Sequence, residues 1–266
     1  MAMSRAIQWK TSANPPSERA GLHNQVATRI GTLITQGRLH EGDVLPNEAV
    51  LGAEFGVSRT ALREAIKVLA SKGLVEVRRK TGTRVRPRAA WNMLDPELLG
   101  WLFAGSIAPD GLSELMELRR MIEPSAARLA SERASNQDLQ RIDAAFRKME
   151  EVANDVAASV EADLSFHLAL LDAAQNDFLR SFGALIQSAL RASFRLTNSN
   201  HALYLRSLKL HGDVVKAVLA RRGNAAEKAM LVMLTQTSED IAAQSQGIRV
   251  KSKARQVKKH LSDRRR

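Results

Sequence analysis

The 266-residue chain contains no cysteine, which excludes disulfide bonds, zinc fingers and thiol catalysis. This absence is compatible with a reducing cytoplasm, where we expect the protein to reside. Aromatic residues make up only 4% of the chain, a composition that suits helices packed through Leu, Ala, Val and Met. No run approaches about 18 apolar residues, and residues 1–10 lack the apolar core of a signal peptide. The sequence therefore predicts neither a membrane span nor a leader.

The net charge of +12 is unevenly distributed. Residues 1–90 carry 15 Lys/Arg against 7 Asp/Glu, residues 91–248 carry 16 against 20, and residues 249–266 carry 9 against 1. A basic head, a slightly acidic body and a basic tail indicate one polyanion-binding domain joined to a more neutral one. For the tail, a solvated surface is an equally good interpretation.

Length and patterning predict a mainly α-helical protein of two domains. We expect a flexible arm over residues 1–20, a first domain over 21–88, a linker over 89–108, an all-α domain over 109–247 and a basic disordered tail over 248–266. Within the linker, Asp95 followed by Pro96 predicts the start of a short helix, N-cap then N1, packed between the domains.

The first domain has the pattern of a helix-turn-helix. Apolar residues recur at helical spacing from Gly21 to Gly37, and Asn47 can cap a second, short helix. Gly56 and Val57 then make a tight turn, and Ser58 is placed to cap a third helix. One side of that helix carries a basic, hydroxyl-bearing stripe, consisting of Arg59, Thr60, Arg63 and Lys67. Such a stripe suits entry into the DNA major groove, although a solvated helix face gives the same pattern.

A β-hairpin is predicted directly after the third helix. Residues 74–77 alternate as a strand, and residues 84–86 can pair back with them. The tip between them, residues 78–83, is a basic wing. Three helices and a basic hairpin in this order form a winged helix-turn-helix, so we expect double-stranded DNA as the partner.

This domain resembles the GntR family of winged-helix regulators. The resemblance rests on Leu45-Pro46-Asn47-Glu48, Phe55-Gly56-Val57-Ser58-Arg59-Thr60, Leu62-Arg63-Glu64-Ala65, Leu69 and Gly73-Leu74-Val75. It implies DNA contacts from the recognition helix and the wing, at Ser58, Arg59, Thr60, Arg63, Arg79 and Lys80. Two positions depart from the family pattern. Ala49 stands where many relatives place an arginine that faces the DNA backbone, and Lys80 stands where the wing often has glycine.

The second domain is predicted to be an α-bundle of about six helices. Breaks fall near residues 109–110, 135–136, 154–155, 176–177, 198–200 and 223–224. Several polar residues lie on its apolar stripes, namely Arg119, Asp163, His167 and His211. Asp163 and His167 are four residues apart and share a helix face. Buried charges need a partner, a metal or a ligand, and imidazole with carboxylate suits Zn²⁺ or a similar divalent ion. Histidines satisfied within an ordinary core would show the same pattern.

The second domain resembles the FadR-type C-terminal domain, called FCD. The residues that carry the likeness are Glu117-Leu118-Arg119, Glu123-Pro124, Ala127, Leu129-Ala130 and Asp163-Leu164-Ser165-Phe166-His167. The resemblance implies a metal held by Asp163, His167 and His211 beneath an effector. The expected fourth ligand lies 22 residues after His211, where Met233 stands. A thioether is a poor ligand for such a dication, so water or the effector would complete the site, or no metal would bind.

The linker segment Trp91-Asn92-Met93-Leu94-Asp95-Pro96-Glu97, with Trp101 soon after, resembles galactonate-type sugar-acid regulators of this subfamily. The likeness implies an organic-acid effector whose carboxylate pairs with Arg119. Asn198 could meet its hydroxyl groups, or could cap a helix end. Family membership further implies a homodimer on a pseudo-palindromic operator, released when the effector binds.

Two other function classes remain open from the residues alone. A metal-dependent hydrolase could activate water at Asp163, His167 and His211, but no general base or framed nucleophile accompanies them. A sequence-independent architectural DNA-binding protein would have no need of inward polar residues. The sequence therefore favours a DNA-binding regulator, a repressor, and not an enzyme.

Overall fold

The computed structural model describes residues 21–103 and 109–263, and the chain divides into two compact units, residues 1–106 and 107–266. The arm predicted over residues 1–20 lies outside the described residues, as do residues 104–108 and 264–266. Within the described ranges, no helix combines the length and apolar character that crossing a membrane requires.

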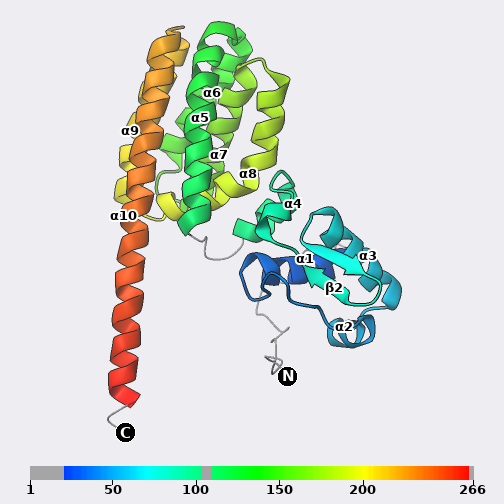
Figure 1. Cartoon of the computed structure of the whole chain (residues 1–266). Coiled ribbons are helices and arrows are strands. Elements are labelled where there is room, and N and C mark those ends of the chain that lie inside the picture. Colours follow the sequence, from blue (N-terminus) through cyan, green and yellow to red (C-terminus); the bar gives the residue numbers. More distant parts are fainter. Residues whose placement is uncertain (1–20, 104–108, 264–266) are drawn as a thin grey trace. The chain divides into compact units, whose positions relative to one another are not determined.

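Over its described residues, 21–103, the N-terminal unit contains three helices, a two-stranded hairpin and a further short helix (Figure 1). In chain order the elements are α1 (Leu22–Thr35), α2 (Glu48–Phe55), α3 (Arg59–Ser71), β1 (Val75–Arg78), β2 (Gly82–Val85), the 3-10 turn η1 (Arg88–Ala90) and α4 (Pro96–Phe103). The predicted winged helix-turn-helix class is confirmed.

The turn between α2 and α3 follows the predicted chemistry. The Asn47 side chain accepts a hydrogen bond from the Val50 amide at 3.0 Å, and the Ser58 hydroxyl accepts one from the Ala61 amide at 3.2 Å. Both side chains therefore cap their helices. Between them Gly56 ends α2 with φ +65, in the left-handed region that glycine tolerates. This turn sets how α3 is presented on the surface of the unit.

The hairpin is antiparallel, with Val75 opposite Val85 and Arg78 opposite Gly82. Its tip is therefore only residues 79–81, shorter than the predicted 78–83. One pairing was not predicted. The Leu45 amide donates to the Thr83 carbonyl at 2.8 Å, so the segment before α2 lies against the outer side of β2. This contact ties the wing to the helix-turn-helix.

Helix α4 is part of the N-terminal core, which differs from the predicted linker. Leu98 and Trp101 are buried in the same cluster as the apolar faces of α1 and α3. The Lys72 ammonium, at the end of α3, lies 2.8 Å from carboxylate oxygens of both Asp95 and Glu97. Asp95 also caps α4, as predicted, by accepting from the Leu98 amide at 2.9 Å. The physical reason for the difference is aromatic packing, because the Trp101 ring lies directly against Gly31 of α1.

The C-terminal unit consists, over the residues described, of six helices, as the sequence predicted. They are α5 (Pro109–Arg133), α6 (Asn136–Glu151), α7 (Val156–Ala173), α8 (Asp177–Asn198), α9 (His201–Leu219) and α10 (Gly223–Asp263). The predicted breaks hold the N-caps Ser135, Asp155, Asn176 and Asn200. Side-chain capping explains why polar residues at these points mark the helix starts.

Helix α10 packs along α5 and α9 and then continues beyond them (Figure 1). The sequence predicted a disordered tail from residue 248, whereas α10 runs through Asp263. After Gly247 the segment contains no glycine or proline and is rich in Lys and Arg, both strong helix formers. Helix propensity, which the charge-based interpretation ignored, accounts for the difference.

Candidate functional site

The predicted DNA-reading residues lie on one exposed face of α3. Ser58, Arg59, Thr60 and Arg63 are all exposed, whereas the opposite face is buried in the core. The Ser58 oxygen accepts the capping hydrogen bond, so its hydroxyl hydrogen remains available to donate to another group. The face therefore offers two guanidinium groups and two hydroxyl groups.

Two carboxylates lie beside this face, and the sequence did not predict them as partners. The Arg63 Nε donates to both carboxylate oxygens of Glu48, at 3.1 and 3.0 Å. On α3 itself, Lys67 pairs with Glu64 at 2.8 Å. The Arg63 contact joins residues 15 positions apart on two helices, so only the fold brings them together.

The wing presents its basic residues at the tip of the hairpin. Arg79 and Lys80 are exposed in the turn that joins β1 to β2. Arg78, one residue earlier, pairs with Glu76 at 2.8 Å. The two residues predicted to contact DNA are thus placed at the outermost part of the hairpin.

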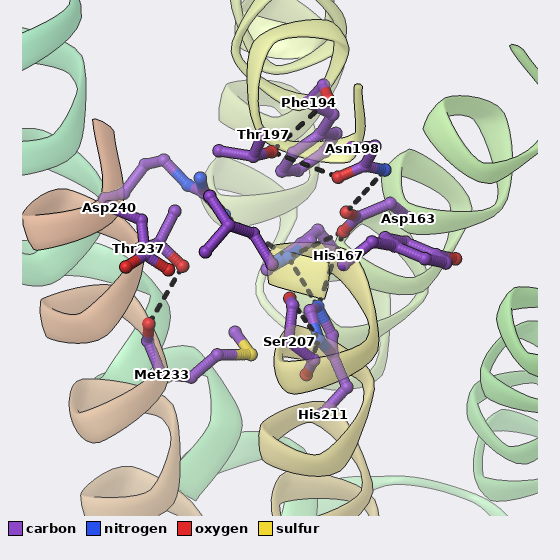
Figure 2. Close-up of a pocket in the computed structure, with 13 residues that line it drawn as sticks. Asp163, His167, Phe194, Thr197, Asn198, Ser207, His211, Met233, Thr237 and Asp240 are labelled. Carbon is purple, nitrogen blue, oxygen red and sulfur yellow. Dashed lines mark hydrogen bonds and ion pairs between the residues drawn. The ribbon is translucent and has the colours of Figure 1, made fainter. Parts of the chain in front are cut away.

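A pocket in the C-terminal unit brings together every residue predicted for effector or metal (Figure 2). Its empty volume is about 370 Å³ when the open solvent at its mouth is included. Its lining comes from α5, α7, α8, α9 and α10 and consists of Arg119, Asp163, His167, Phe194, Thr197, Asn198, Leu203, Tyr204, Ser207, His211, Met233, Thr237 and Asp240.

Three potential metal ligands meet at the base of this pocket. Asp163, His167 and His211 are buried, and one ligand atom from each lies within 4.8 Å of the others. The Asp163 Oδ1 is 3.3 Å from the His167 Nε2 and 3.4 Å from the His211 Nε2, yet it has no hydrogen-bond partner of suitable geometry. A buried, unpaired carboxylate oxygen facing two imidazole nitrogens is a donor set that suits a cation.

The hydrogen-bond partners of the two Nδ1 atoms determine which nitrogen of each imidazole faces the pocket. The His167 Nδ1 lies 2.6 Å from a Glu123 carboxylate oxygen, and the His211 Nδ1 lies 2.8 Å from the Ser207 carbonyl oxygen. Because a carbonyl only accepts, the His211 Nδ1 carries a proton, and the ionised Glu123 assigns the same tautomer to His167. Each Nε2 then carries a lone pair; at His167 this atom lies 3.3 Å from the Arg119 Nη2, and the two Nε2 atoms lie 3.4 Å apart. Ligating histidines are commonly oriented in this way by an outer partner.

The buried Arg119 connects this cluster to the rest of the pocket. Its Nε donates to Glu123 at 2.6 Å, its Nη2 lies 3.3 Å from the His167 Nε2, and its guanidinium lies 5.1 Å from the Phe194 ring centre. Burial by itself would raise the pKa of Glu123, but the charge of Arg119 and the hydrogen bonds from Arg119 and His167 outweigh it and lower the pKa to about 2. Glu123 is thus a carboxylate inside the core, and Arg119 keeps N–H groups free for a ligand.

Asn198 and Met233 complete the predicted set. Asn198 is the last residue of α8, but Ser199 occupies the C-cap position, and the Asn198 amide instead donates to the Asp163 Oδ2 at 3.3 Å. The helix-cap alternative is therefore not what the structure has. Met233 is buried in the pocket wall on α10, as its register with His211 implied.

The sequence analysis missed Glu123, which lies behind the pocket against Arg119 and His167, and several residues of the pocket lining. Glu123 carried a usable signal, because it follows Arg119 by four residues on the same helix. The others, Thr197, Ser207, Thr237 and Asp240, are small or polar residues on helices that are polar elsewhere as well. Nothing in their local pattern distinguishes them, since only the packing of α8, α9 and α10 directs them to one hollow.

Known proteins match both units. Residues 22–85 match the family of bacterial regulatory proteins described as the gntR family, and residues 114–236 match the FCD domain. The galactonate operon transcriptional repressor of Escherichia coli is 34% identical over 216 residues, covering 81% of this chain and 94% of its own length. The regulator LutR of Bacillus subtilis is 33% identical over 212 residues, 78% of this chain and 95% of its own.

A solved structure supports the same fold. Lar, described as controlling expression of the agr system of Listeria monocytogenes, has a TM-score of 0.62 at 20% identity, over 84% of this chain and 98% of that one. The two curated relatives are named as transcription regulators and not as enzymes, so the hydrolase alternative is not favoured.

Proposed function

The chain belongs to the FadR subfamily of the GntR transcription regulators, and we propose that it is a homodimeric repressor released from its operator by a sugar acid. The observation that carries the proposal is one pocket in which a buried arginine adjoins three metal-type ligand atoms. An architectural DNA-binding protein has no use for such a pocket.

Operator reading is assigned to the exposed face of α3 and to the wing. Arg59 and Arg63 carry guanidinium groups that suit the O6 and N7 atoms of guanine in the major groove. Ser58 and Thr60 supply hydroxyls near the start of the helix, where phosphates approach most closely. Arg79 and Lys80 at the wing tip add contacts to the neighbouring backbone or minor groove. Two copies of this surface would read a pseudo-palindromic operator.

The metal-ligand set fits a divalent ion such as Zn²⁺. Asp163 would supply Oδ1, and His167 and His211 would each supply Nε2, because their Nδ1 atoms are already committed to Glu123 and Ser207. A bound ion would draw effector oxygens into the open coordination positions. Met233 offers only a thioether where a fourth ligand is expected, so three protein ligands leave room for the effector.

The effector is assigned to the remaining polar lining of the pocket. Arg119 already pairs with Glu123 and donates toward His167, but a guanidinium has five N–H groups, and those left over can bind a carboxylate. Asn198 lies beside Asp163, Thr197 donates to the Asn198 amide oxygen, and both side chains can meet hydroxyl groups. An acid bearing several hydroxyls uses this combination better than an aliphatic acid. The galactonate repressor's name supports the choice of an aldonic acid.

Release requires that the effector bind one conformation of the dimer better than the other. The pocket is lined from five helices, so a ligand that contacts them together would favour one arrangement of the bundle. By thermodynamic linkage, the effector weakens operator binding by a free energy equal to the difference between its binding free energies for the free and the DNA-bound protein. The sign of this coupling, weaker DNA binding, is part of the proposal.

Thermal denaturation of the full chain tests pocket occupancy. We expect galactonate or a related aldonate to raise the unfolding temperature. The rise should be smaller after a chelator removes divalent ions, and lactate at equal concentration should raise the temperature less than the aldonate does. A ligand at 100 times its Kd stabilises by about 2.7 kcal/mol. Asn198→Ala should reduce this rise in unfolding temperature. Arg120→Ala should not, because Arg120 follows the pocket residue Arg119 in the chain but does not line the pocket itself. Equal shifts in both variants, or none with any acid, would contradict the assignment.

A further inference from the structure

Glu48 and Arg63 form an ion pair across the turn of the helix-turn-helix. Glu48 is the first residue of α2, and Arg63 lies in the second turn of α3. The Arg63 Nε is 3.1 and 3.0 Å from the two oxygens of Glu48. Both side chains are exposed, with 66% of Arg63 and 46% of Glu48 accessible. The pair therefore lies on the surface that α3 presents, and not in the core.

Only the inner edge of the guanidinium is used in this contact. Its single Nε–H is shared between the two carboxylate oxygens, and among the described residues the Nη1 and Nη2 groups form no hydrogen bond. Recognition of a guanine requires two N–H donors directed at O6 and N7. The two Nη groups can supply both donors while Nε stays bound to Glu48. The ion pair is thus compatible with base reading.

Stability alone does not explain the pair. An exposed ion pair of this kind contributes little to folding. It also places a negative charge on a surface that is to approach phosphates, which disfavours general DNA binding. In return, a long and flexible arginine side chain is held in one orientation before DNA arrives, which removes part of the ordering cost of binding. A carboxylate in this position favours contact with a base edge over a swing toward the phosphates.

We propose that Glu48 is a positioning residue that orients Arg63 for one guanine in each operator half-site and so determines specificity there. The inference rests on the proposed function, because it requires α3 to enter the major groove. Glu48 itself does not contact a base in this assignment. Its removal should therefore lower sequence preference without lowering overall affinity.

The test measures preference at each base pair separately. The wild-type full chain first selects its operator from a random double-stranded library, and all single-base-pair changes of that operator are then compared for binding at one salt concentration. Arg63→Ala should flatten the preference at one G·C pair per half-site by about tenfold or more. Glu48→Ala and Glu48→Gln should lose most of the same preference while binding random DNA equally or more tightly.

Glu64→Gln is the matched control. Glu64 is also an exposed carboxylate, 48% accessible, and is paired with a basic side chain on α3. Its removal should tighten binding to every sequence alike and leave the preference at each base pair unchanged. Tryptophan fluorescence confirms that each variant is folded, since Trp91 and Trp101 both lie in or against the core of the N-terminal unit.

The outcomes separate the inference from the function on which it rests. If Arg63→Ala flattens one position and both Glu48 variants leave it intact, Glu48 does not position Arg63 and the inference fails alone. If Arg63→Ala changes no preference while the wild type selects a defined operator, both the inference and the assignment of Arg63 to a base fail. If Glu48 and Glu64 variants behave alike, the effect is general charge and the inference is again overturned.

Discussion

Gly31 and Trp101 form the contact that holds α4 on the N-terminal unit, and adding one methyl group at Gly31 perturbs it directly. A Cβ built on Gly31 would lie 2.2 and 2.4 Å from two carbon atoms of the Trp101 ring. Ordinary carbon–carbon contact is about 3.5–4.0 Å, so the ring or the helix must move by about 1.3 Å or more. Trp101 is only 5% exposed and has little room to do so.

The expected cost of Gly31→Ala follows from two opposed effects. Alanine within a helix is favoured over glycine by about 0.5–1 kcal/mol. Overpacking of a filled core costs about 1–3 kcal/mol. A clash as close as 2.2 Å puts the cost in the upper half of that range, so we expect a net loss of about 1–2.5 kcal/mol in the free energy of unfolding of the N-terminal unit. Urea unfolding followed by tryptophan fluorescence does not report on the C-terminal unit, because residues 107–266 contain no tryptophan, whereas Trp91 and Trp101 lie in the N-terminal unit.

A double-mutant cycle with Trp101→Leu identifies the cause. Trp101→Leu alone removes a large buried side chain and is itself destabilising. In that background the added methyl group no longer meets the indole ring, so Gly31→Ala should become neutral or stabilising. The coupling energy should be about 1 kcal/mol or more. A neutral Gly31→Ala in the wild type, or the same effect in both backgrounds, would refute the packing of α4 described above.

Three further outcomes are expected. Lys72→Met should lower the stability of the N-terminal unit by on the order of 2 kcal/mol, because Asp95 is left partly buried without its cation. Lys67→Met removes the cation of an exposed ion pair and should be nearly neutral. Similar losses of stability in the two variants would contradict this expectation. The capping box and Arg141 hold the pKa of Asp138 at about 2, against the opposing effect of burial and an ordinary value of 3.8. The ionised Asp138 therefore contributes its full stabilisation of the fold above pH 3.8 and loses it as the pH falls through about 2. The difference in unfolding free energy between wild type and Asp138→Asn should shrink over that pH range. A difference that stays constant would contradict this role of Asp138. Deleting residues 249–266, which removes 9 Lys/Arg and 1 Asp, should flatten the salt dependence of operator binding if the tail contacts phosphates, and an unchanged slope would exclude that role.

Local chemistry was readable from the sequence alone. The caps at Asn47, Ser58 and Asp95 were predicted because each is a polar residue immediately before a periodic stretch. The shared face of Asp163 and His167 followed from their spacing on one helix. Such features depend on residues within one or two helical turns, so periodicity is enough to locate them.

Contacts between distant segments could not be predicted in this way. The pairing of Glu48 with Arg63, of Glu123 with His167, and of Trp101 with Gly31 each joins two separate elements. The local pattern singled out His167 and Arg63 but revealed the partner of neither, because the partners depend on how helices cross. The length of α10 was misjudged for a different reason, because charge was weighed where helix propensity decided the structure.

The central claim is that an acid bound in the pocket of the C-terminal unit weakens operator binding by the N-terminal unit. Fluorescence anisotropy measures it most directly, as the Kd of the full chain for its selected operator at fixed salt, with and without the aldonate that raises the unfolding temperature. The account predicts a Kd increased by about 5- to 150-fold, as is typical of such coupling, and a smaller increase for Asn198→Ala. An unchanged or lower Kd at saturating acid would contradict it.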